Sequence, residues 1–252
     1  MRKKIAKKPI SLKKLIPNFI TISALALGVT SIRLALNERW EFAVYCILIA
    51  SILDGIDGRV ARMLNATSPF GAELDSLCDF ANFGISPAIL IYLWSFHLCE
   101  FQLMTWFAIL LYVACMAIRL ARFNTAINSS AHNVGVMKYF SVGVPAPPGA
   151  ILALMPMMLE FDIATFFDIE ICSHACLIAS YIILIAILLA SRLPTPLLKN
   201  ITIKPEYLSL IMILSAFLII SVTIYPWYSL PILSLLYIMT IPVCYVITRK
   251  HN

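Results

Sequence analysis

The chain has 252 residues, of which 61% are apolar and only 13% are charged. Soluble domains are usually about 45–50% apolar and about 25% charged, so this composition excludes an ordinary soluble domain and indicates a membrane protein. The formal net charge of +6 does not indicate a nucleic-acid partner, because many of the basic residues lie in a short tail directly before an apolar run.

The N-terminal tail, residues 1–14, holds seven of the 19 lysine and arginine residues. A basic segment next to a spanning helix lies against anionic lipid headgroups, with about 1 kcal/mol of attraction per basic residue. We therefore expect residues 1–14 to form a cytoplasmic tail at the surface of a lipid bilayer.

Apolar runs of about 20 residues recur along the rest of the chain, and this length is needed to cross about 30 Å of hydrocarbon. We therefore expect an all-α, polytopic membrane bundle. The eight predicted spans are roughly 15–36, 40–64, 71–97, 101–124, 140–160, 171–192, 207–225 and 227–247.

Proline, serine and cysteine positions refine these spans. Ser68 and Pro69 can cap and open the third helix. Three prolines (Pro145, Pro147 and Pro148) lie inside the fifth apolar run, which predicts a kink or a broken helix there. The seven cysteines form no CxxC pair, and most lie in apolar runs, so we expect neither disulfides nor a cysteine metal site.

The distribution of basic residues predicts the topology. If the N-terminus is cytoplasmic and eight helices alternate, 17 basic residues lie on the inner side and only Arg33 and Arg39 lie on the outer side. This strong positive-inside bias predicts that both termini are cytoplasmic. The predicted outer loop at 160–170 agrees, because it carries four acidic residues and no base.

Four of the six aspartates lie near the cytoplasmic ends of the second and third spans: Asp54, Asp57, Asp75 and Asp79. A carboxylate at the centre of a spanning helix costs about 2.5–3.5 kcal/mol on insertion scales, so four of them need compensation. The nearest basic residues are too few to supply all of it.

Helical spacing places these aspartates on two faces that can meet. At 100° per residue, one arc of the second helix holds Asp54, Asp57, Gly58, Ala61 and Arg62. One stripe of the third helix holds Gly71, Asp75, Asp79, Asn82 and Ser86. The connection at 64–70 is short, so the helices are antiparallel neighbours, and we expect one pocket with four carboxylates and an arginine.

Carboxylate clusters bind hard divalent cations such as Mg²⁺, which keep substrate phosphates as further ligands. Two cations would neutralise four carboxylates and clamp a pyrophosphate during an in-line displacement at phosphorus. Gly58 and Ala61 leave room for a nucleotide near the helix backbone, and Arg62 can hold phosphate.

The aspartates allow two other interpretations. They could pair with arginines to hold the bundle together, but four on facing arcs beside Gly58 and Gly71 argue against that. A divalent cation transporter would explain the carboxylates, but not the glycines, Arg62 or the position at the cytoplasmic edge. Transport paths also carry polar groups near the midplane of several helices, and the last three spans are almost wholly apolar.

The run Asp57-Gly58-x-x-Ala61-Arg62, then eight residues, then Gly71-x-x-x-Asp75-x-x-x-Asp79, resembles the signature of the CDP-alcohol phosphatidyltransferase family at every defined position. Asp54 supplies the extra upstream aspartate. Segments 119–124 (RLARFN) and 140–147 (FSVGVPAP) resemble the branch of that family that uses serine. The opening of the first span, with Pro17, Asn18 and Thr21, is also similar to the family's.

This resemblance implies a fold, an activity and a set of site residues. It covers residues 15–192 as a catalytic core of six helices, and residues 193–252 then add two helices with a lipid-packing role. It implies that two metal ions, Mg²⁺ or Mn²⁺, are held by four aspartates, Asp54, Asp57, Asp75 and Asp79. The CDP moiety would lie along Gly58, Ala61, Arg62, Gly71, Asn18 and Thr21.

The implied reaction transfers a phosphatidyl group from CDP-diacylglycerol to L-serine and gives phosphatidylserine and CMP. Asp79 is the implied base for the acceptor hydroxyl, and direct activation of that hydroxyl by a metal ion is the alternative. The same signature serves glycerol 3-phosphate and inositol as acceptors. The family resemblance also implies a homodimer in the cell membrane with the site at the cytoplasmic face.

Arg119 and Arg122 are three residues apart in the fourth span, within reach of the cytoplasmic face. One of them is expected to anchor the lipid phosphate or the serine carboxylate, and the alternative is a pair of arginines that snorkel at a helix end. Lys138 is expected at the headgroups, and His97, His132 and His251 are expected to be loop or interfacial residues.

Overall fold

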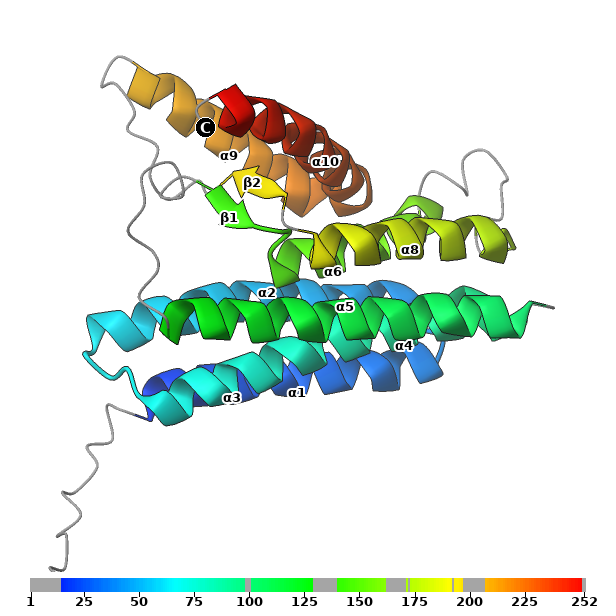
Figure 1. The fold of residues 1–252 in the computed structure, drawn as a ribbon, viewed down its shortest axis with the longest axis horizontal. Coiled ribbons are helices and arrows are strands. Elements are labelled where there is room, and N and C mark those ends of the chain that lie inside the picture. Colours follow the sequence, from blue (N-terminus) through cyan, green and yellow to red (C-terminus); the bar gives the residue numbers. More distant parts are fainter. Residues whose placement is uncertain are drawn as a thin grey trace, which may run out of the picture.

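A computed structural model of the chain describes residues 15–97, 101–128, 140–161, 171, 173–191, 193–196 and 207–250. The predicted basic tail at 1–14 lies outside the described residues, as do Lys138, His132 and His251. Within the described part the fold is a helical bundle with one short two-stranded ladder (Figure 1), so the all-α prediction is confirmed.

The first two helices, α1 (Ile16–Leu36) and α2 (Trp40–Met63), form an antiparallel hairpin whose bounds agree with the predicted spans. The face that α1 buries is made of small residues and one proline, namely Pro17, Thr21, Ala24, Gly28, Ser31 and Ala35. Small side chains let helix backbones approach closely in a membrane, where apolar burial alone does not drive association. The face of α1 therefore packs tightly on α2 and on the third span.

The third predicted span is one long helix with two π-helical segments. It runs as α3 (Pro69–Asp79), η2 (Phe80–Ile85), α4 (Ser86–Ile91) and η3 (Tyr92–Phe96). Single-turn π segments occur mostly inside α-helices and often at functional sites. The predicted N-cap is confirmed, because the Ser68 hydroxyl accepts a hydrogen bond from the Gly71 N–H at 3.0 Å and Pro69 follows it.

Three further helices complete the core. They are α5 (Gln102–Asn128), α6 (Ala146–Leu159) and α8 (Ala175–Ala190). The strand β1 (Phe140–Val142), between α5 and α6, pairs antiparallel with β2 (Pro194–Pro196), which follows α8, and the sequence did not predict this ladder. Gly143 follows β1 with a φ of +81°, which a residue with a side chain rarely adopts.

The predicted helix at 140–160 is interrupted at its three prolines, as one of the two predicted outcomes, a kink or a broken helix, requires, and no kinked helix runs through them. Pro145 is the N-cap of α6, and Pro147 lies in its first turn, where a missing N–H breaks no helical hydrogen bond. The prolines therefore start α6 at residue 146 and exclude residues 140–145 from the helix. Pro156 is the proline inside α6.

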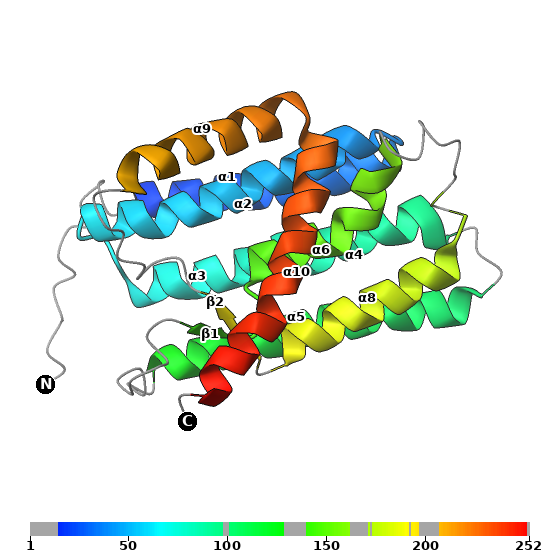
Figure 2. The same ribbon diagram turned by 90° about the horizontal axis from the view of Figure 1, so that it is seen from above.

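The last two helices, α9 (Leu208–Ile224) and α10 (Pro226–Lys250), differ in their packing. None of the α9 residues is buried, whereas Trp227 of α10 is buried and packs against Tyr45 and Phe161, with ring centroids 4.7 Å apart in each pair. Figure 2 shows α10 running obliquely across the other helices. The core of the bundle therefore includes α10, while α9 lies on its outside.

Helix length and apolarity identify a multi-pass membrane protein. Among the described residues, four helical segments are long and apolar enough to cross a bilayer: Ile16–Leu36, Pro69–Phe96, Gln102–Thr125 and Pro226–Cys244. The apolar helices α6, α8 and α9 are shorter. With 24 residues, α2 is also long enough to cross, but its last third carries the charges of the site. The positions of the eight predicted helices are therefore confirmed, while the cytoplasmic location of the termini stays a prediction.

We expect Gly28→Ala to destabilise the bundle by about 1–3 kcal/mol through overpacking. A Cβ at residue 28 would collide with the side-chain carbonyl of Asn82, which is only 1% exposed and cannot move aside. Gly55→Ala is the matched control, because a Cβ at residue 55 meets no atom within 4 Å. Thermal unfolding in detergent checks this, and equal melting temperatures for the two variants would contradict the tight α1 contact.

Candidate active site

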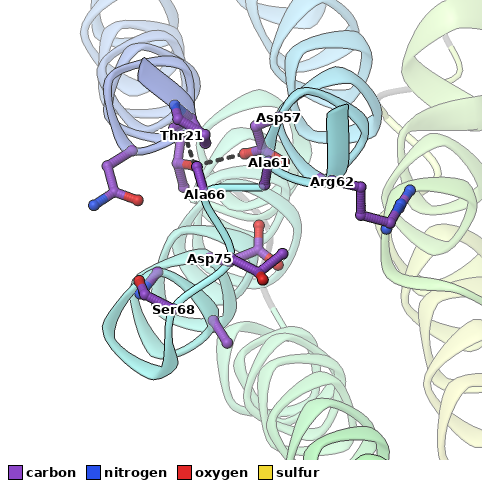
Figure 3. A pocket seen from close by; sticks show the side chains of 13 residues that line it. Thr21, Asp57, Ala61, Arg62, Ala66, Ser68 and Asp75 are labelled. Atoms are coloured by element: carbon purple, nitrogen blue, oxygen red, sulfur yellow. Dashed lines mark hydrogen bonds between the residues drawn. The ribbon is translucent and has the colours of Figure 1, made fainter. Parts of the chain in front are cut away.

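A pocket of about 170 Å³ lies where the start of α1, the end of α2 and the start of α3 meet. Figure 3 shows side chains from all three elements converging on it. Its lining residues are Pro17, Asn18, Thr21, Asp57, Gly58, Ala61, Arg62, Ala66, Thr67, Ser68, Gly71, Ala72 and Asp75. The pocket lining therefore includes eight of the twelve predicted site residues, all but Asp54, Asp79, Arg119 and Arg122.

Asp57 is the most buried carboxylate of the site, with 4% of its surface exposed. The Thr21 hydroxyl lies 2.6 Å from its Oδ2 and 3.1 Å from the Pro17 carbonyl oxygen. A hydroxyl has one proton to donate, and the shorter contact to a charged acceptor is the stronger one. Thr21 therefore fixes the orientation of the Asp57 side chain, and this bond joins α1 to α2 (Figure 3).

Three carboxylates face one another at the inner side of the pocket. Oxygens of Asp54, Asp57 and Asp75 all lie within 4.8 Å of one another. Oxygen ligands of one Mg²⁺ ion at about 2.1 Å lie about 3–4 Å apart, so a small closure would let these three share an ion. The donor set is also of the right kind, because hard divalent cations take carboxylate oxygens. These residues therefore fit the predicted metal site.

Asp79 lies one turn beyond Asp75 and outside this group of three. Its side chain interacts with Asp54 and, through its charge, with Asp75 and Arg119. The structure thus places the four predicted aspartates in one neighbourhood, with Asp79 on the side of Arg119.

The two glycines of the motif have different surroundings. A Cβ on Gly71 would lie 3.1 Å from Asn18 Oδ1 and 3.2 Å from Ser68 Oγ, so Gly71 permits the close approach of α3 to α1. A Cβ on Gly58 would meet only Arg62 Nη1, at 3.8 Å. Packing therefore accounts for Gly71, whereas the missing side chain at Gly58 leaves open space in the pocket.

Arg62 lines the pocket, but its side chain is exposed. Figure 3 shows it extending away from the Thr21–Asp57 pair. It does not occupy the centre of the cluster with the aspartates, as the shared helical arc had led us to expect. The Arg62 guanidinium stands at the rim instead.

The two arginines of α5 have distinct environments. Arg122 donates from Nη1 to the Ala190 carbonyl at 2.7 Å and from Nη2 to the Ser191 carbonyl at 3.1 Å. Two donor atoms of Arg119, Nε and Nη1, are buried and have no hydrogen-bond partner among the described residues. Arg122 therefore holds the end of α8, and Arg119 has donors left for a ligand.

Some lining residues were missed by sequence reasoning. Ala66, Thr67 and Ala72 lie in or after the connection between α2 and α3, and they face the pocket beside Ser68. Their signal in the sequence is a run of small residues between the two halves of the motif. Small side chains there leave the pocket open between two helix ends.

Comparison with known proteins agrees with this geometry. A chain from Mycobacterium leprae named CDP-diacylglycerol–serine O-phosphatidyltransferase is 32% identical over 231 residues, which cover 91% of this chain and 74% of the relative. A Helicobacter pylori (strain 26695) protein with the same name is 34% identical over 193 residues, covering 77% of this chain and 76% of the relative. The family model for CDP-alcohol phosphatidyltransferases matches residues 14–249. The matched region holds all four aspartates and nearly every described helix, and the chain therefore belongs to the CDP-alcohol phosphatidyltransferase family.

Proposed function

We propose that this chain transfers the phosphatidyl group of CDP-diacylglycerol to the hydroxyl of L-serine, forming phosphatidylserine and releasing CMP. The observation that carries the proposal is the cluster of Asp54, Asp57 and Asp75 beside an open pocket at the end of a membrane bundle. Family membership supports the CDP-linked donor, and the names of the relatives support serine as the acceptor.

The donor lipid would place its acyl chains in the bilayer and its nucleotide head in the pocket. Gly58 and Ala61 leave space against the α2 backbone, and Asn18, Thr21 and Gly71 form the opposite wall. Arg62 at the rim can bind a phosphate from the aqueous side.

Asp54, Asp57 and Asp75 would hold one divalent ion, and Asp79 beside Asp54 would help to hold a second. When two such ions are bound, they offset the carboxylate charge and draw charge from the pyrophosphate, which makes CMP a better leaving group. The Thr21 hydroxyl keeps one Asp57 oxygen in a fixed direction and leaves the other available as a ligand.

Asp79 is the group that we assign as the base for the acceptor. The serine hydroxyl attacks the phosphorus on the lipid side, its proton goes to Asp79, and the bond from that phosphorus to the CMP oxygen breaks. The position of Asp79 outside the group of three supports this role, which requires that one Asp79 oxygen is free for the hydroxyl in the substrate complex. A general base must come within about 2.6–3.2 Å of the proton donor in the substrate complex.

Arg119 is the better supported of the two arginines as the anion-binding residue. Its buried Nε and Nη1 match a carboxylate or phosphate, which a guanidinium binds through two parallel hydrogen bonds. Arg122 already donates to the last carbonyls of α8, so we assign it a structural role.

We also propose an orientation in the membrane, a catalytic core and an oligomeric state for the enzyme. The positive-inside bias supports a site at the cytoplasmic face of the cell membrane and cytoplasmic termini. We expect residues 15–192 to form the catalytic core and residues 193–252 to support it. The family resemblance also supports a homodimer.

The deciding experiment supplies the purified protein with radiolabelled CDP-diacylglycerol and, in separate reactions, L-serine, glycerol 3-phosphate or inositol. Labelled phosphatidylserine in the first reaction alone is the expected result. Transfer to another acceptor would overturn the serine assignment. Transfer to none, together with uptake of divalent cations into proteoliposomes, would replace the enzyme with a transporter.

The aspartates are tested with Asp75→Asn and Asp79→Asn. We expect kcat to fall by about 10²–10⁴-fold for Asp79→Asn, because the base is lost. Asp75→Asn should also abolish transfer, since it removes a metal ligand, while both variants still fold. Glu73→Gln is the matched control, because this exposed carboxylate lies on the same helix. Undiminished turnover in either aspartate variant would refute the assignment.

Metal dependence gives a second test. Excess EDTA should remove activity, and Mg²⁺ or Mn²⁺ should restore it. The carboxylates and the pyrophosphate are all negatively charged, so cations are needed to bring them together. Asp54→Asn should then need a higher Mn²⁺ concentration for half-maximal activity. Activity that persists at full rate in chelator would contradict the metal site.

The arginines are compared through Arg119→Ala and Arg122→Ala. Loss of a charge-assisted pair costs about 1.5–3 kcal/mol, so KM for serine should rise at least tenfold for Arg119→Ala with little change in KM for the lipid. Arg122→Ala should mainly lower the melting temperature. Steady-state kinetics with each substrate varied in turn distinguishes them, and the opposite pattern would exchange the two roles.

A further inference from the structure

The third span contains a carbonyl group that its own helix cannot satisfy in the α-helical pattern. The Phe83 carbonyl would accept from the N–H four residues later, but that residue is Pro87, which has no N–H. Phe83 is fully buried, and a buried carbonyl without a partner is costly. In a π-helical turn the donor is the N–H five residues later, here that of Ala88, so a donor from another helix can add to or replace the bond within this span.

Tyr112 of α5 supplies that donor. Its hydroxyl donates to the Phe83 carbonyl oxygen at 2.7 Å, and the Tyr112 side chain is 0% exposed. The accepting residue belongs to the π-helical turn η2, which begins directly after Asp79. The bond thus fixes the third span to α5 four residues after Asp79.

A second connection fixes the same helix on the other side of Asp79. The amide of Asn124 on α5 donates to the Ser76 hydroxyl at 2.9 Å. Ser76 precedes Asp79 by three residues and directly follows Asp75. These two hydrogen bonds therefore hold the stretch with Asp75 and Asp79 to one neighbouring helix at both ends.

Contact with α1 completes the placement of this stretch. The Ser86 hydroxyl lies 3.0 Å from the Gly28 carbonyl oxygen of α1 and 3.0 Å from the Ala81 carbonyl oxygen of its own span, and it can donate to either. The Asn82 side chain fits against the bare backbone of Gly28. The π-helical turn is thus bonded to α5 on one side and packed against α1 on the other.

We propose that Tyr112 and Asn124 are positioning residues that set the register of the third span against α5 and thereby hold Asp75 and Asp79 opposite Asp54, Asp57 and Arg119. This role rests on the proposed function for its effect on turnover. Neither residue touches the pocket, so each acts through the helix that it holds.

The chain offers a matched control for Tyr112. The Tyr181 hydroxyl of α8 donates to the Leu152 carbonyl oxygen of α6, also at 2.7 Å. Pro156 stands four residues after Leu152, as Pro87 does after Phe83. The same hydrogen bond thus compensates for a proline in both places, but α6 carries none of the four aspartates.

The experiment compares Tyr112→Phe, Tyr181→Phe and Ser76→Ala with the wild type. Both tyrosine variants should lose thermal stability, because each loses a hydrogen bond to a buried carbonyl. Only Tyr112→Phe and Ser76→Ala should lower kcat, on the order of tenfold to a hundredfold for Tyr112→Phe, since small misplacements of reacting groups are costly. In Tyr112→Phe and Ser76→Ala, KM for CDP-diacylglycerol should stay unchanged. The affinity of these two variants for Mn²⁺, measured by electron paramagnetic resonance, should fall.

Adding Pro87→Ala to Tyr112→Phe distinguishes an effect on the position of the aspartates from a loss of thermal stability. Alanine returns an N–H that can satisfy the Phe83 carbonyl, so the melting temperature should recover relative to Tyr112→Phe. The connection to α5 is not restored, so kcat should remain low when compared with Pro87→Ala alone. Recovery of kcat in the double variant would overturn the proposal, as would an equal loss of kcat in Tyr181→Phe.

Failure of the two proposals can be told apart. If the wild type makes no phosphatidylserine, the proposed function fails, while Mn²⁺ binding still reports whether Tyr112 positions the aspartates. If Tyr112→Phe does not fold, Ser76→Ala tests the other end of the same stretch. Wild-type kcat and Mn²⁺ affinity in Ser76→Ala would then overturn the positioning role.

Discussion

Repulsion among the carboxylates of Asp54, Asp57 and Asp75 is the constraint on which the rest of the structure depends. Their oxygens lie within 4.8 Å of one another, and two unit charges at that distance repel by about 3.5 kcal/mol at an effective dielectric constant of 20. Without bound cations, the hydrogen bond that Thr21 donates to Asp57 offsets only part of this repulsion. The helices that carry the aspartates must therefore be held together by contacts made elsewhere.

Those contacts come from close packing and from hydrogen bonds between helices. The small residues of α1 bring α2 and the third span close together, and Thr21 joins α1 to the most buried of the carboxylates. On the far side, α5 holds the third span at Ser76 and Phe83. Rigid support of this kind prevents the carboxylates from moving apart, and it keeps the acidic pocket open for the cations and the headgroup of the proposed reaction.

Much of this arrangement could be predicted from the sequence. Apolar run lengths gave the helices to within a few residues, and the 3.6-residue period put the aspartates on facing arcs. The π-helical segments, the β1–β2 ladder and the start of α6 at residue 146 were not predicted, because they depend on bonds between distant segments. The different environments of Arg119 and Arg122 could not be predicted for the same reason. The hydrogen-bond partners of Arg122 are Ala190 and Ser191, which lie far from it in the sequence.

The paired prolines and tyrosines also bear on how the bundle assembles during synthesis. In each pair the hydroxyl comes from a residue 29 positions after the carbonyl, on a helix made later. Until that helix enters the bilayer, the carbonyl would lack this donor in hydrocarbon, where an unsatisfied group costs several kcal/mol. Each proline-containing helix can therefore reach its final shape only after the following tyrosine helix has inserted, which makes the helical pair the unit of membrane integration.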